Sequence, residues 1–504
     1  MTVNMDQRSN ILKYKHLGIY TQNEHVVYMR EDCHVCISEG FEALTRIRVA
    51  NTTDSIVASL NVINSDILLP DEIGLSDAAA KKLKVSGNET LRVSHLEPID
   101  SLSHVRAKIY NQKLDYTAFN EIITDIVEGD YSNIHLSAFI TACAGNRLDV
   151  TEISDLTKAM IASGKQLDWN RKIVVDKHCI GGLPGNRTTP IVVAIVAAYG
   201  LTMPKTSSRA ITSPAGTADT MEVITNVALS SEEIKAVVKK EGGCFVWGGT
   251  AQLSPADDML IKIEKALDID SEGQLIASVL SKKAAAGSTH VVIDIPVGET
   301  AKVRSLVTAQ QLQEQLENVG NTIGLKVKVV ITDGSQPIGR GIGPNLEAID
   351  ILSVLRNEER APKDLKERAL FLAGQLLELS EEIELDNGYE TATQILESGK
   401  AYKKFEAICR AQGRFSHPLK ASYSHEIRAG KIGILQRINN RKISKLAKLS
   451  GAPQSKSAGI LLNVQLDDKI EKGQLLYTLF AESEGELNYA LEYYENHDDI
   501  ITII

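Results

Sequence analysis

The sequence is short of cysteine, of positive charge and of long hydrophobic runs, and each shortage excludes a class of protein. Only six of the 504 residues are cysteines, and they are scattered, which argues against a disulfide framework. Asp and Glu outnumber Lys and Arg by 65 to 55, so the net charge is −10. An acidic chain is poorly suited to nonspecific nucleic-acid binding, which needs a basic surface.

The apolar segments are too short for a membrane span or a signal peptide. The longest run lies near 191–199, whereas a spanning helix needs about 20 apolar residues. The first 30 residues contain charged side chains and no apolar segment of the kind that signal peptides have. We therefore expect a cytoplasmic protein with neither membrane nor nucleic-acid partners, and a buried helix from residue 191.

One pair of cysteines, Cys33 and Cys36, has the spacing of a metal or redox motif. A structural zinc site usually needs a second cysteine pair or a histidine pair, and none stands nearby. Buried packing positions are the favoured interpretation, with metal or redox use as the alternative. We expect no metal site.

The patterning changes along the chain. Short β-type runs at 25–29, 43–50 and 55–63 predict a β-rich N-terminal module, and the run at 43–50 alternates between apolar and polar residues. Apolar residues spaced three and four apart from Phe119 to Val127 predict a helix, and Thr151 is a candidate cap for another. These two helices predict a bundle over roughly 100–172.

Buried strands then alternate with helices, at 172–176, 291–295 and 326–331, which is typical of a mostly parallel α/β sheet. Beyond 418, short strands and a final helix near 483–495 follow. The fold class is therefore α/β, with a helical domain and a large mixed α/β domain separated by a cleft, an N-terminal β-rich module and a β-rich C-terminal lobe. The predicted boundaries are 1–95 for the module, 96–172 with 252–286 for the helical domain, 173–251 with 287–417 for the α/β domain, and 418–504 for the lobe.

The strongest local signal is a glycine-rich stretch, DKHCIGGLPGNRTTP at 176–190, between a predicted strand and a predicted helix. Its glycines allow the backbone to approach an anion, and a helix N-terminus attracts negative charge. Lys177 adds a full positive charge. The stretch is neither a Walker A loop nor a dinucleotide fingerprint. A plain strand-to-helix turn is the alternative interpretation.

Two further stretches carry polar groups of interest. The segment TSSRAITSPAGTADTME at 206–222 is dense in hydroxyls that could complete a phosphate or ribose site, or could only cap a helix. Ser278 and Lys282 are four residues apart and so share one helix face. The plainer interpretation makes Lys282 and Lys283 a solvated surface pair. His178 is a candidate acid or base by its ordinary pKa.

In this order and spacing, these stretches resemble the thymidine phosphorylase family. The family signature corresponds to SSRAI at 207–211 followed by AGTADTME at 215–222, and Pro214 departs from it. SPAD at 254–257 and TDGSQPIGRGIG at 332–343 also match. The resemblance covers roughly 100–490. The N-terminal module places the chain with the long forms, which include bacterial thymidine phosphorylases and archaeal AMP phosphorylases.

The resemblance implies roles for particular residues. Asp270 or His178 would supply the proton to the leaving base. Cys179 replaces the serine that the family has after the histidine, and the base-reading arginine of the short forms has no counterpart. The residues implied in phosphate binding are Lys177, Thr189, Ser207 and Thr217, and those implied in substrate binding are Gly182, Ser208, Arg209, Ala210, Ile211, Thr212, Ser213, Ser278, Lys282 and Lys302.

The resemblance also implies a pentosyltransferase that splits thymidine with phosphate into thymine and 2-deoxyribose 1-phosphate. The main alternative is an AMP phosphorylase that yields the base and ribose 1,5-bisphosphate. A Mg²⁺-dependent phosphoribosyltransferase and a non-catalytic nucleotide-binding protein are the lesser alternatives. Phosphate is then a substrate, no cofactor is required, and family habit favours a homodimer or a larger homo-oligomer.

Overall fold

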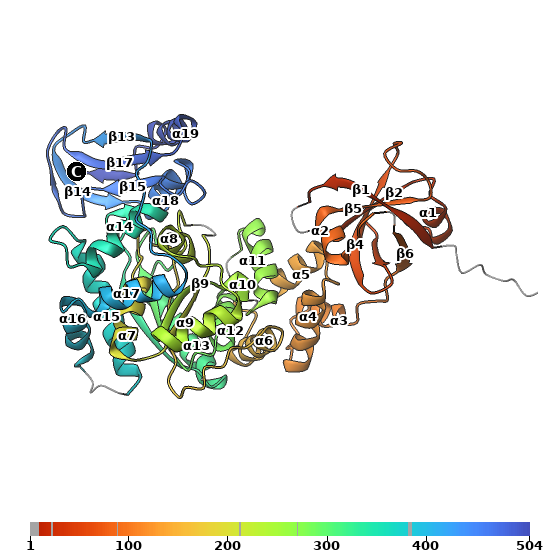
Figure 1. The fold of residues 1–504 in the computed structure, drawn as a ribbon, viewed down its shortest axis with the longest axis horizontal. Helices are drawn as coiled ribbons and strands as arrows, with labels where there is room; N and C mark the ends of the chain where they lie inside the picture. The colour runs from red at the N-terminus through yellow and green to blue at the C-terminus, as the bar shows by residue number, and fades with distance from the viewer. Residues whose placement is uncertain are drawn as a thin grey trace, which may run out of the picture. The chain divides into compact units, whose positions relative to one another are not determined.

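The computed structural model describes residues 10–21, 24–87, 89–210, 213–251, 253–269, 271–381 and 386–504. The chain divides into two compact units, 1–110 with 121–139, and 111–120 with 140–504. In the second unit, helices surround a sheet, and a separate strand-rich lobe ends the chain (Figure 1). Among the described residues, none of the helices is long and apolar enough to cross a membrane.

Six strands of the first unit form a closed barrel in the order β1-β5-β2-β4-β3-β6. The predicted alternation is present in β3, where Ile47 and Val49 point into the core and the residues between them are partly exposed. Cys33 and Cys36 are both buried in this core, as packing positions should be. The elements are β1 (Ile11–Ile19), β2 (Val26–Arg30), α1 (His34–Glu39), β3 (Arg46–Ala50), β4 (Ser55–Ile63), β5 (Glu72–Ser76), α2 (Asp77–Leu83) and β6 (Thr90–His95).

Four helices follow the barrel, and the last of them begins differently from the prediction. Thr151 does not cap α6, because Asp149 does so two residues earlier. The Asp149 carboxylate accepts a hydrogen bond from the Glu152 backbone, and the Glu152 carboxylate accepts one from the Asp149 backbone. This reciprocal capping box satisfies two backbone donors, which Thr151 could not do. The helices are α3 (Leu102–Ile109), α4 (Tyr116–Glu128), α5 (Asn133–Cys143) and α6 (Val150–Ala162).

The α/β sheet consists of parallel strands whose order reverses beside β7. Strands β11, β10 and β7 form one ladder and β8 and β9 another, and a bridge between Val174 and Thr202 joins them. The chain runs from β7 to β8 on one side, then returns to β10 on the other side. Ligands of open α/β sheets bind beyond the carboxyl ends of the strands at such a reversal. The strands are β7 (Val175–Cys179), β8 (Met203–Ser207), β9 (Gly243–Trp247), β10 (His290–Val297) and β11 (Lys326–Asp333).

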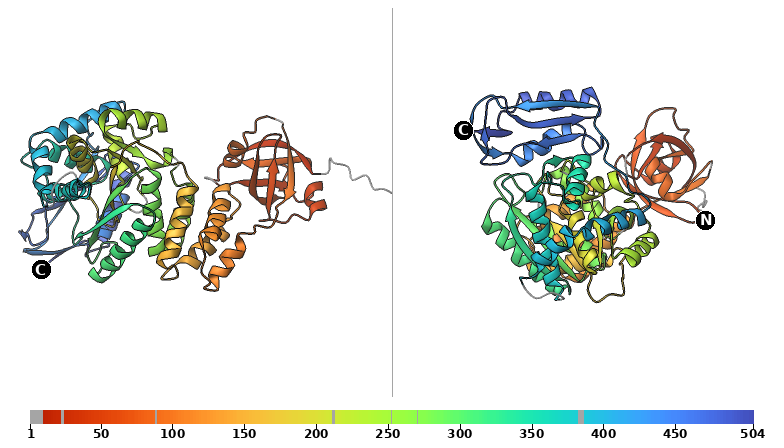
Figure 2. Two further views of the ribbon diagram at one scale, coloured as in Figure 1. Left: turned by 90° about the horizontal axis from the view of Figure 1, so that it is seen from below. Right: turned by 60° about the vertical axis from the view of Figure 1, so that its left-hand side comes forward.

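Helices cover both faces of this sheet (Figure 2). The apolar run predicted as a buried helix is α7, and its residues 189–197 are all buried. The helices of this region are α7 (Thr189–Tyr199), α8 (Thr217–Ile224), α9 (Ser231–Glu241), α10 (Gly248–Ala251), α11 (Pro255–Leu267), α12 (Glu272–Ala285), α13 (Leu306–Thr322), α14 (Pro344–Leu355), α15 (Lys363–Leu379), α16 (Gly388–Glu397) and α17 (Lys400–Ala411).

The C-terminal lobe takes one strand from the α/β region. Strand β12 follows the loop after β11 and pairs with β15 of the lobe, in the sheet order β12-β15-β17-β13. The predicted final helix is present as α19. The elements are β12 (Gly341–Ile342), β13 (Tyr423–Arg428), β14 (Gly433–Ile438), α18 (Asn440–Leu449), β15 (Gly459–Leu462), β16 (Lys469–Ile470), β17 (Leu475–Ala481), α19 (Glu484–Glu495) and β18 (Ile501–Ile503).

Candidate functional site

The strand that leads into the glycine-rich loop lies further along the chain than predicted. The apolar residues at 172–176 predicted the strand there, whereas β7 spans Val175–Cys179 and pairs in register with β10. Lys177 and His178 therefore belong to a strand and not to a loop. Since successive side chains of a strand point to opposite faces, the two residues enter different surroundings.

Lys177 is 1% exposed, and its ammonium donates a hydrogen bond to Thr188 Oγ1 at 2.8 Å. Burial lowers the pKa of Lys177, although the nearby Asp294 opposes this. An ammonium has three N–H donors, and this is its one hydrogen bond within the described part of the chain. An anion placed beside it would accept the remaining N–H groups and raise the pKa again.

The loop after β7 is shaped by glycines in the left-handed region. Gly181 and Gly182 have φ of 97° and 81°. A Cβ on Gly182 would lie 2.4 Å from the backbone nitrogen of Lys302, whereas a Cβ on Gly181 would meet nothing within 4 Å. The loop thus packs against the segment after β10 at Gly182, stays open at Gly181, and ends at the N-terminus of α7, where Thr189 is the first helical residue. Such a helix end favours anions.

Cys179 ends β7 on the same face as Lys177. Burial, followed by the charge of Asp294, raises the pKa of this thiol to about 12, so it stays protonated. Asn186 Nδ2 lies 3.5 Å from both Cys179 Sγ and Asp294 Oδ2. Asn186 Oδ1 is buried and has no hydrogen-bond partner among the described residues. A neutral thiol, which is a weak donor, stands where the resemblance leads us to expect a serine hydroxyl.

Ser207 and Thr217 flank the hydroxyl-rich loop. Ser207 ends β8, and its buried hydroxyl has no partner in the described ranges. Thr217 begins α8, and its hydroxyl accepts a hydrogen bond from Arg187 Nη1 at 3.1 Å. Ser208 is exposed, and Ser213 donates to the backbone of Ala215 at 2.9 Å.

The side chain of Arg209, which was predicted to contact substrate, is held by carboxylates. Its guanidinium binds Glu222 at 2.6 and 2.8 Å and Asp219 at 3.2 Å, and it lies over the Trp247 ring. Arg209 and then Lys456 hold the pKa of Glu222 at about 2. Asp219 also accepts from the backbone of Ala210 at 2.7 Å. These contacts stabilise the loop conformation.

On the opposite face of β7, two lysines share one carboxylate. Asp176 is fully buried, and Lys205 and Lys283 approach it to 2.9 and 2.8 Å. Burial alone would raise the pKa of Asp176, but the two lysines outweigh it and keep the pKa below its ordinary value. The interpretation of Lys283 as part of a solvated pair is therefore wrong, because this side chain is buried. Only Lys282 is partly exposed, and it pairs with Asp257 at 2.6 Å.

His178 lies on this second face. Burial, and then Lys283, Lys205, Lys282 and Lys177, lower its pKa well below 6.5. The imidazole is therefore neutral near pH 7, able to donate one hydrogen bond and accept another. The ion pair between Lys283 and Asp176 shows that α12, which also carries the half-buried Ser278, packs against β7.

The structure thus gathers most of the predicted residues at the carboxyl edge of the sheet. Gly182 lies against Lys302, and Lys177 donates to Thr188, the residue before Thr189. Arg187, from the same glycine-rich stretch, donates to Thr217 of the hydroxyl-rich segment. Ile211, Thr212 and Asp270 lie outside the described residues.

Three cations were missed in the sequence: Arg187, Lys205 and Lys283. Lys205 interrupts an otherwise uncharged strand, MPKTS, and a charge in a buried strand indicates an internal ion pair. Arg187 stands inside the glycine-rich stretch itself. No local pattern distinguishes Lys283 from Lys282, because only the packing of α12 decides which of them is buried.

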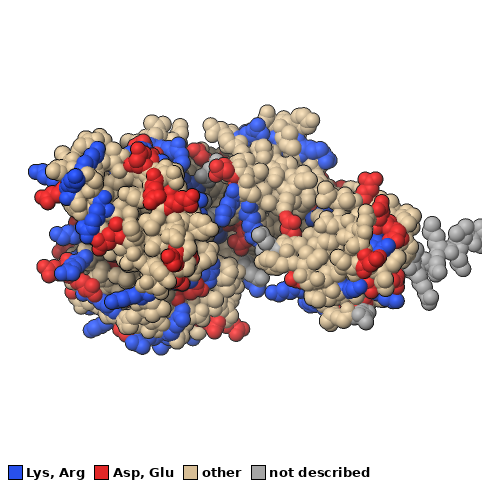
Figure 3. Space-filling view, turned by 90° about the horizontal axis from the view of Figure 1, so that it is seen from above, with Lys and Arg blue, Asp and Glu red and all other residues tan. Residues whose placement is uncertain are grey.

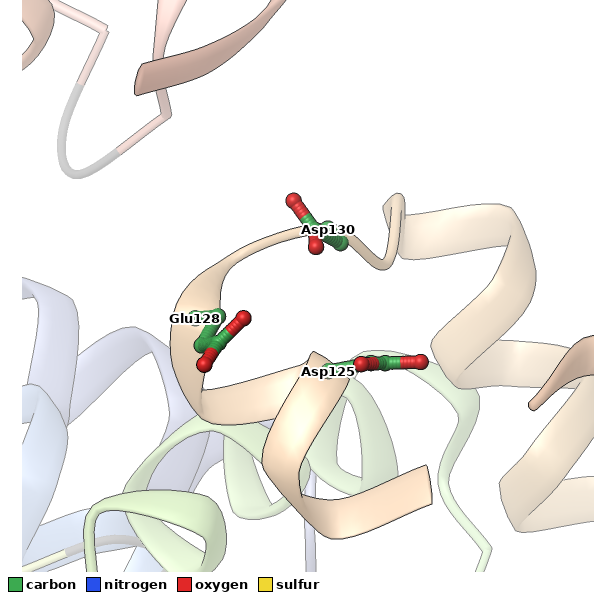
Figure 4. A group of neighbouring side chains, drawn as sticks. All are labelled: Asp125, Glu128 and Asp130. Carbon is green, nitrogen blue, oxygen red and sulfur yellow. The ribbon is translucent and has the colours of Figure 1, made fainter. Parts of the chain in front are cut away.

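Three carboxylates elsewhere, Asp125, Glu128 and Asp130, have oxygens within 4.8 Å of one another at the end of α4 (Figure 4). Ser101 donates to Asp125 at 2.5 Å, and Arg46 donates to the backbone of Gly129 at 2.7 Å. Nothing besides the clustering points to an ion there. Asp257, the acidic residue of the SPAD segment, instead faces the Lys282 ammonium.

Neither of two cavities outlined by the described residues is lined by a residue of the glycine-rich loop. One of about 370 Å³ is lined by residues that include Arg340, Arg360 and Gln465. The other, of about 120 Å³, includes Thr300 and Arg437. We place the candidate site by its chemistry at the carboxyl edge of the sheet, because neither cavity is lined by any of the predicted residues.

On the face shown in Figure 3, positively and negatively charged residues are interspersed over the second unit.

The lowered pKa of His178 predicts a loss of stability in acid. Between its folded pKa and its ordinary 6.5, the unfolded chain binds the proton more readily. Stability therefore falls as the pH drops below 6.5, by up to about 1.4 kcal/mol per pH unit. The melting temperature should drop less between pH 7.5 and pH 5.5 in His178→Gln than in the wild type. Equal losses in the two proteins would contradict a depressed pKa.

Comparisons with known proteins agree with this architecture. Residues 102–164 match the model of a glycosyl transferase family helical bundle domain, 171–402 its a/b domain, and 434–500 a pyrimidine nucleoside phosphorylase C-terminal domain. The anthranilate phosphoribosyltransferases of Thermus thermophilus and Saccharomyces cerevisiae share the fold. Their TM-scores are 0.52 and 0.51 at 20% and 15% identity, covering 61% and 63% of this chain and 98% and 99% of theirs. The two matched family models place the chain in a glycosyl transferase family.

Full-length relatives narrow this class. A "Putative thymidine phosphorylase" of Legionella pneumophila (strain Corby) is 56% identical over 98% of this chain and 95% of its own length. One from Hahella chejuensis (strain KCTC 2396) is 53% identical over 99% of both chains. The chain therefore belongs to the thymidine phosphorylase family.

Proposed function

We propose that the protein catalyses the reversible phosphorolysis of a nucleoside, with thymidine as the substrate. In this reaction, inorganic phosphate and thymidine give thymine and 2-deoxyribose 1-phosphate. The names of the full-length relatives support this substrate. The observation that carries the reaction type is the buried charge at the edge of the sheet.

That charge is positive. Lys177, Lys205 and Lys283 are 1%, 4% and 4% exposed, whereas the carboxylates buried with them are Asp176 and Asp294. Asp176 is shared by two of the lysines, so Lys177 has no carboxylate in hydrogen-bonding contact among the described residues. A buried, unpaired cation is costly. A phosphate on the adjacent loop would balance it, with Lys177, Thr189, Ser207 and Thr217 as its ligands.

Phosphate held there would attack the anomeric carbon of the sugar. As the bond to the base breaks, the sugar gains oxocarbenium character, which the phosphate negative charge stabilises. The base leaves with developing negative charge and requires a proton or hydrogen bonds. We assign the proton to Asp270, because neutral His178 is a poor acid and better suited to donating a hydrogen bond. Ser278, Lys282 and Lys302 would contact the nucleoside together with the loop from Ser208 to Ser213.

The test is release of free base by the purified protein. Thymidine, uridine, AMP and CMP are incubated with and without phosphate, and the base is quantified by chromatography. We expect release from thymidine that requires phosphate and survives EDTA. Faster release from AMP would replace the substrate but keep the reaction type. Activity that needs Mg²⁺ and a pyrophosphorylated sugar would instead indicate a phosphoribosyltransferase, and no turnover with any substrate would contradict an enzyme.

A further inference from the structure

Arg187 has been given no part in the proposed reaction, yet its side chain connects three segments around the site. The residue lies between the glycines and α7, and its side chain is 13% exposed. Nε donates to Glu347 of α14 at 2.6 Å, Nη1 to the Thr217 hydroxyl at 3.1 Å and Nη2 to the Ala215 carbonyl at 2.8 Å. One guanidinium thus ties the glycine-rich loop to the start of α8.

The direction of the Arg187–Thr217 hydrogen bond is fixed, because a guanidinium has donors and no acceptor. The Thr217 oxygen must accept, and its own hydrogen is left to point elsewhere. We propose that Arg187 is a positioning residue that fixes the Thr217 hydroxyl as a hydrogen-bond donor to the bound phosphate. This inference rests on the proposed function, since Thr217 is taken as a phosphate ligand.

Arg187 is itself held rigidly. Glu347 is fully buried and also accepts from the Thr220 hydroxyl at 2.8 Å. Thr220 lies three residues after Thr217 on α8, so the same carboxylate orients the helix and the arginine. The guanidinium cannot rotate away from Thr217 without breaking its bonds to Glu347 and Ala215. Its loss should weaken phosphate binding and leave the nucleoside contacts of α12 in place.

The test removes the guanidinium without leaving a buried carboxylate unpaired. In Arg187→Met/Glu347→Gln, the amide can still accept from Thr220. We expect the KM for phosphate to rise about tenfold, as for the loss of one oriented hydrogen bond to a charged group. The KM for nucleoside should change less than about twofold. A purely structural role would instead lower kcat or raise both KM values together.

A double-mutant cycle isolates the route through Thr217. Thr217→Val removes the hydroxyl and keeps the shape. In that background, the Arg187→Met/Glu347→Gln change should raise the phosphate KM by less than about twofold, because the interaction it supports is already gone. Full additivity of the two effects would overturn the inference.

The matched control is Arg356→Ala, which removes an arginine beyond the far end of α14. It is paired with Glu358 and stacked on Tyr402. Nine residues from Glu347, it lies roughly 13 Å along the helix, and both KM values should be unchanged. Isothermal titration with phosphate alone separates the two proposals. If the wild type binds phosphate and the Arg187 variant binds it equally well, only the inference fails. If the wild type neither binds phosphate nor releases base, both fail.

Discussion

Lys177→Met should abolish phosphate-dependent base release while leaving the fold intact. Methionine is close to lysine in shape and suits a buried position. It should therefore occupy the buried space beside Thr188 that the Lys177 side chain fills. Among the described residues, the ammonium is the one buried lysine charge beside the glycine-rich loop that lacks a bound carboxylate. Losing a preorganised donor of this kind lowers the rate by about 10²–10³-fold. Because the positive charge is lost as well, we expect kcat/KM for phosphate to fall by an amount near the upper end of this range.

Steady-state kinetics at varied phosphate concentration measures this effect, and thermal denaturation checks the fold. Lys239→Met, an exposed lysine in the last turn of α9, is the matched control and should behave as wild type. A Lys177→Met enzyme within about threefold of wild-type kcat/KM would exclude the lysine from phosphate activation.

Asp176→Asn should destabilise the protein strongly. The substitution leaves Lys205 and Lys283 buried without a carboxylate, and breaking a buried ion pair from one side costs about 3–5 kcal/mol. Burial, partly offset by Asp176, already lowers the pKa of Lys283 to about 7. Without Asp176 this pKa should fall further, so Lys283 should become neutral in the folded variant at a lower pH than in the wild type.

Thermal denaturation at pH 7 measures the loss of stability. Adding Lys283→Met to Asp176→Asn should recover part of the loss, because only one cation then lacks a partner. Asp71→Asn, which breaks an exposed pair with Lys13, should melt close to the wild type. If Asp176→Asn melted as the wild type does, the lysines would have to be stabilised by something other than this carboxylate.

The fold could be anticipated because its elements have strong local patterns. The apolar run of α7 and the alternation in β3 survive in the structure because burial decides both. The start of β7 could not be read in the same way. Asp176, Lys177 and His178 look like loop residues, and only charged partners from β8 and α12 make a strand of them possible.

The site could be predicted only in part, because the sequence shows local patterns and not contacts between distant segments. Glycines and hydroxyl residues near the end of a strand can be recognised in the sequence. The structure places Lys177, Gly182 and Thr217 along the carboxyl edge of the sheet. Ion pairs between distant segments cannot be recognised in the sequence, because the partners of Arg187 and Lys283 lie 160 and 107 positions away. Long-range pairing is a property of the tertiary fold and has no local signature.

Strand β12 connects the C-terminal lobe to the glycine-rich loop. A Cβ on Gly185, in the glycine-rich loop, would lie 2.4 Å from the Ile338 carbonyl and 3.0 Å from that of Gly341. Gly341 is paired in turn with Leu461 of β15. A chain shortened before residue 418 would keep Ile338 and Gly341 beside the glycine-rich loop but would lose β15, the strand that pairs with β12 and holds it in place.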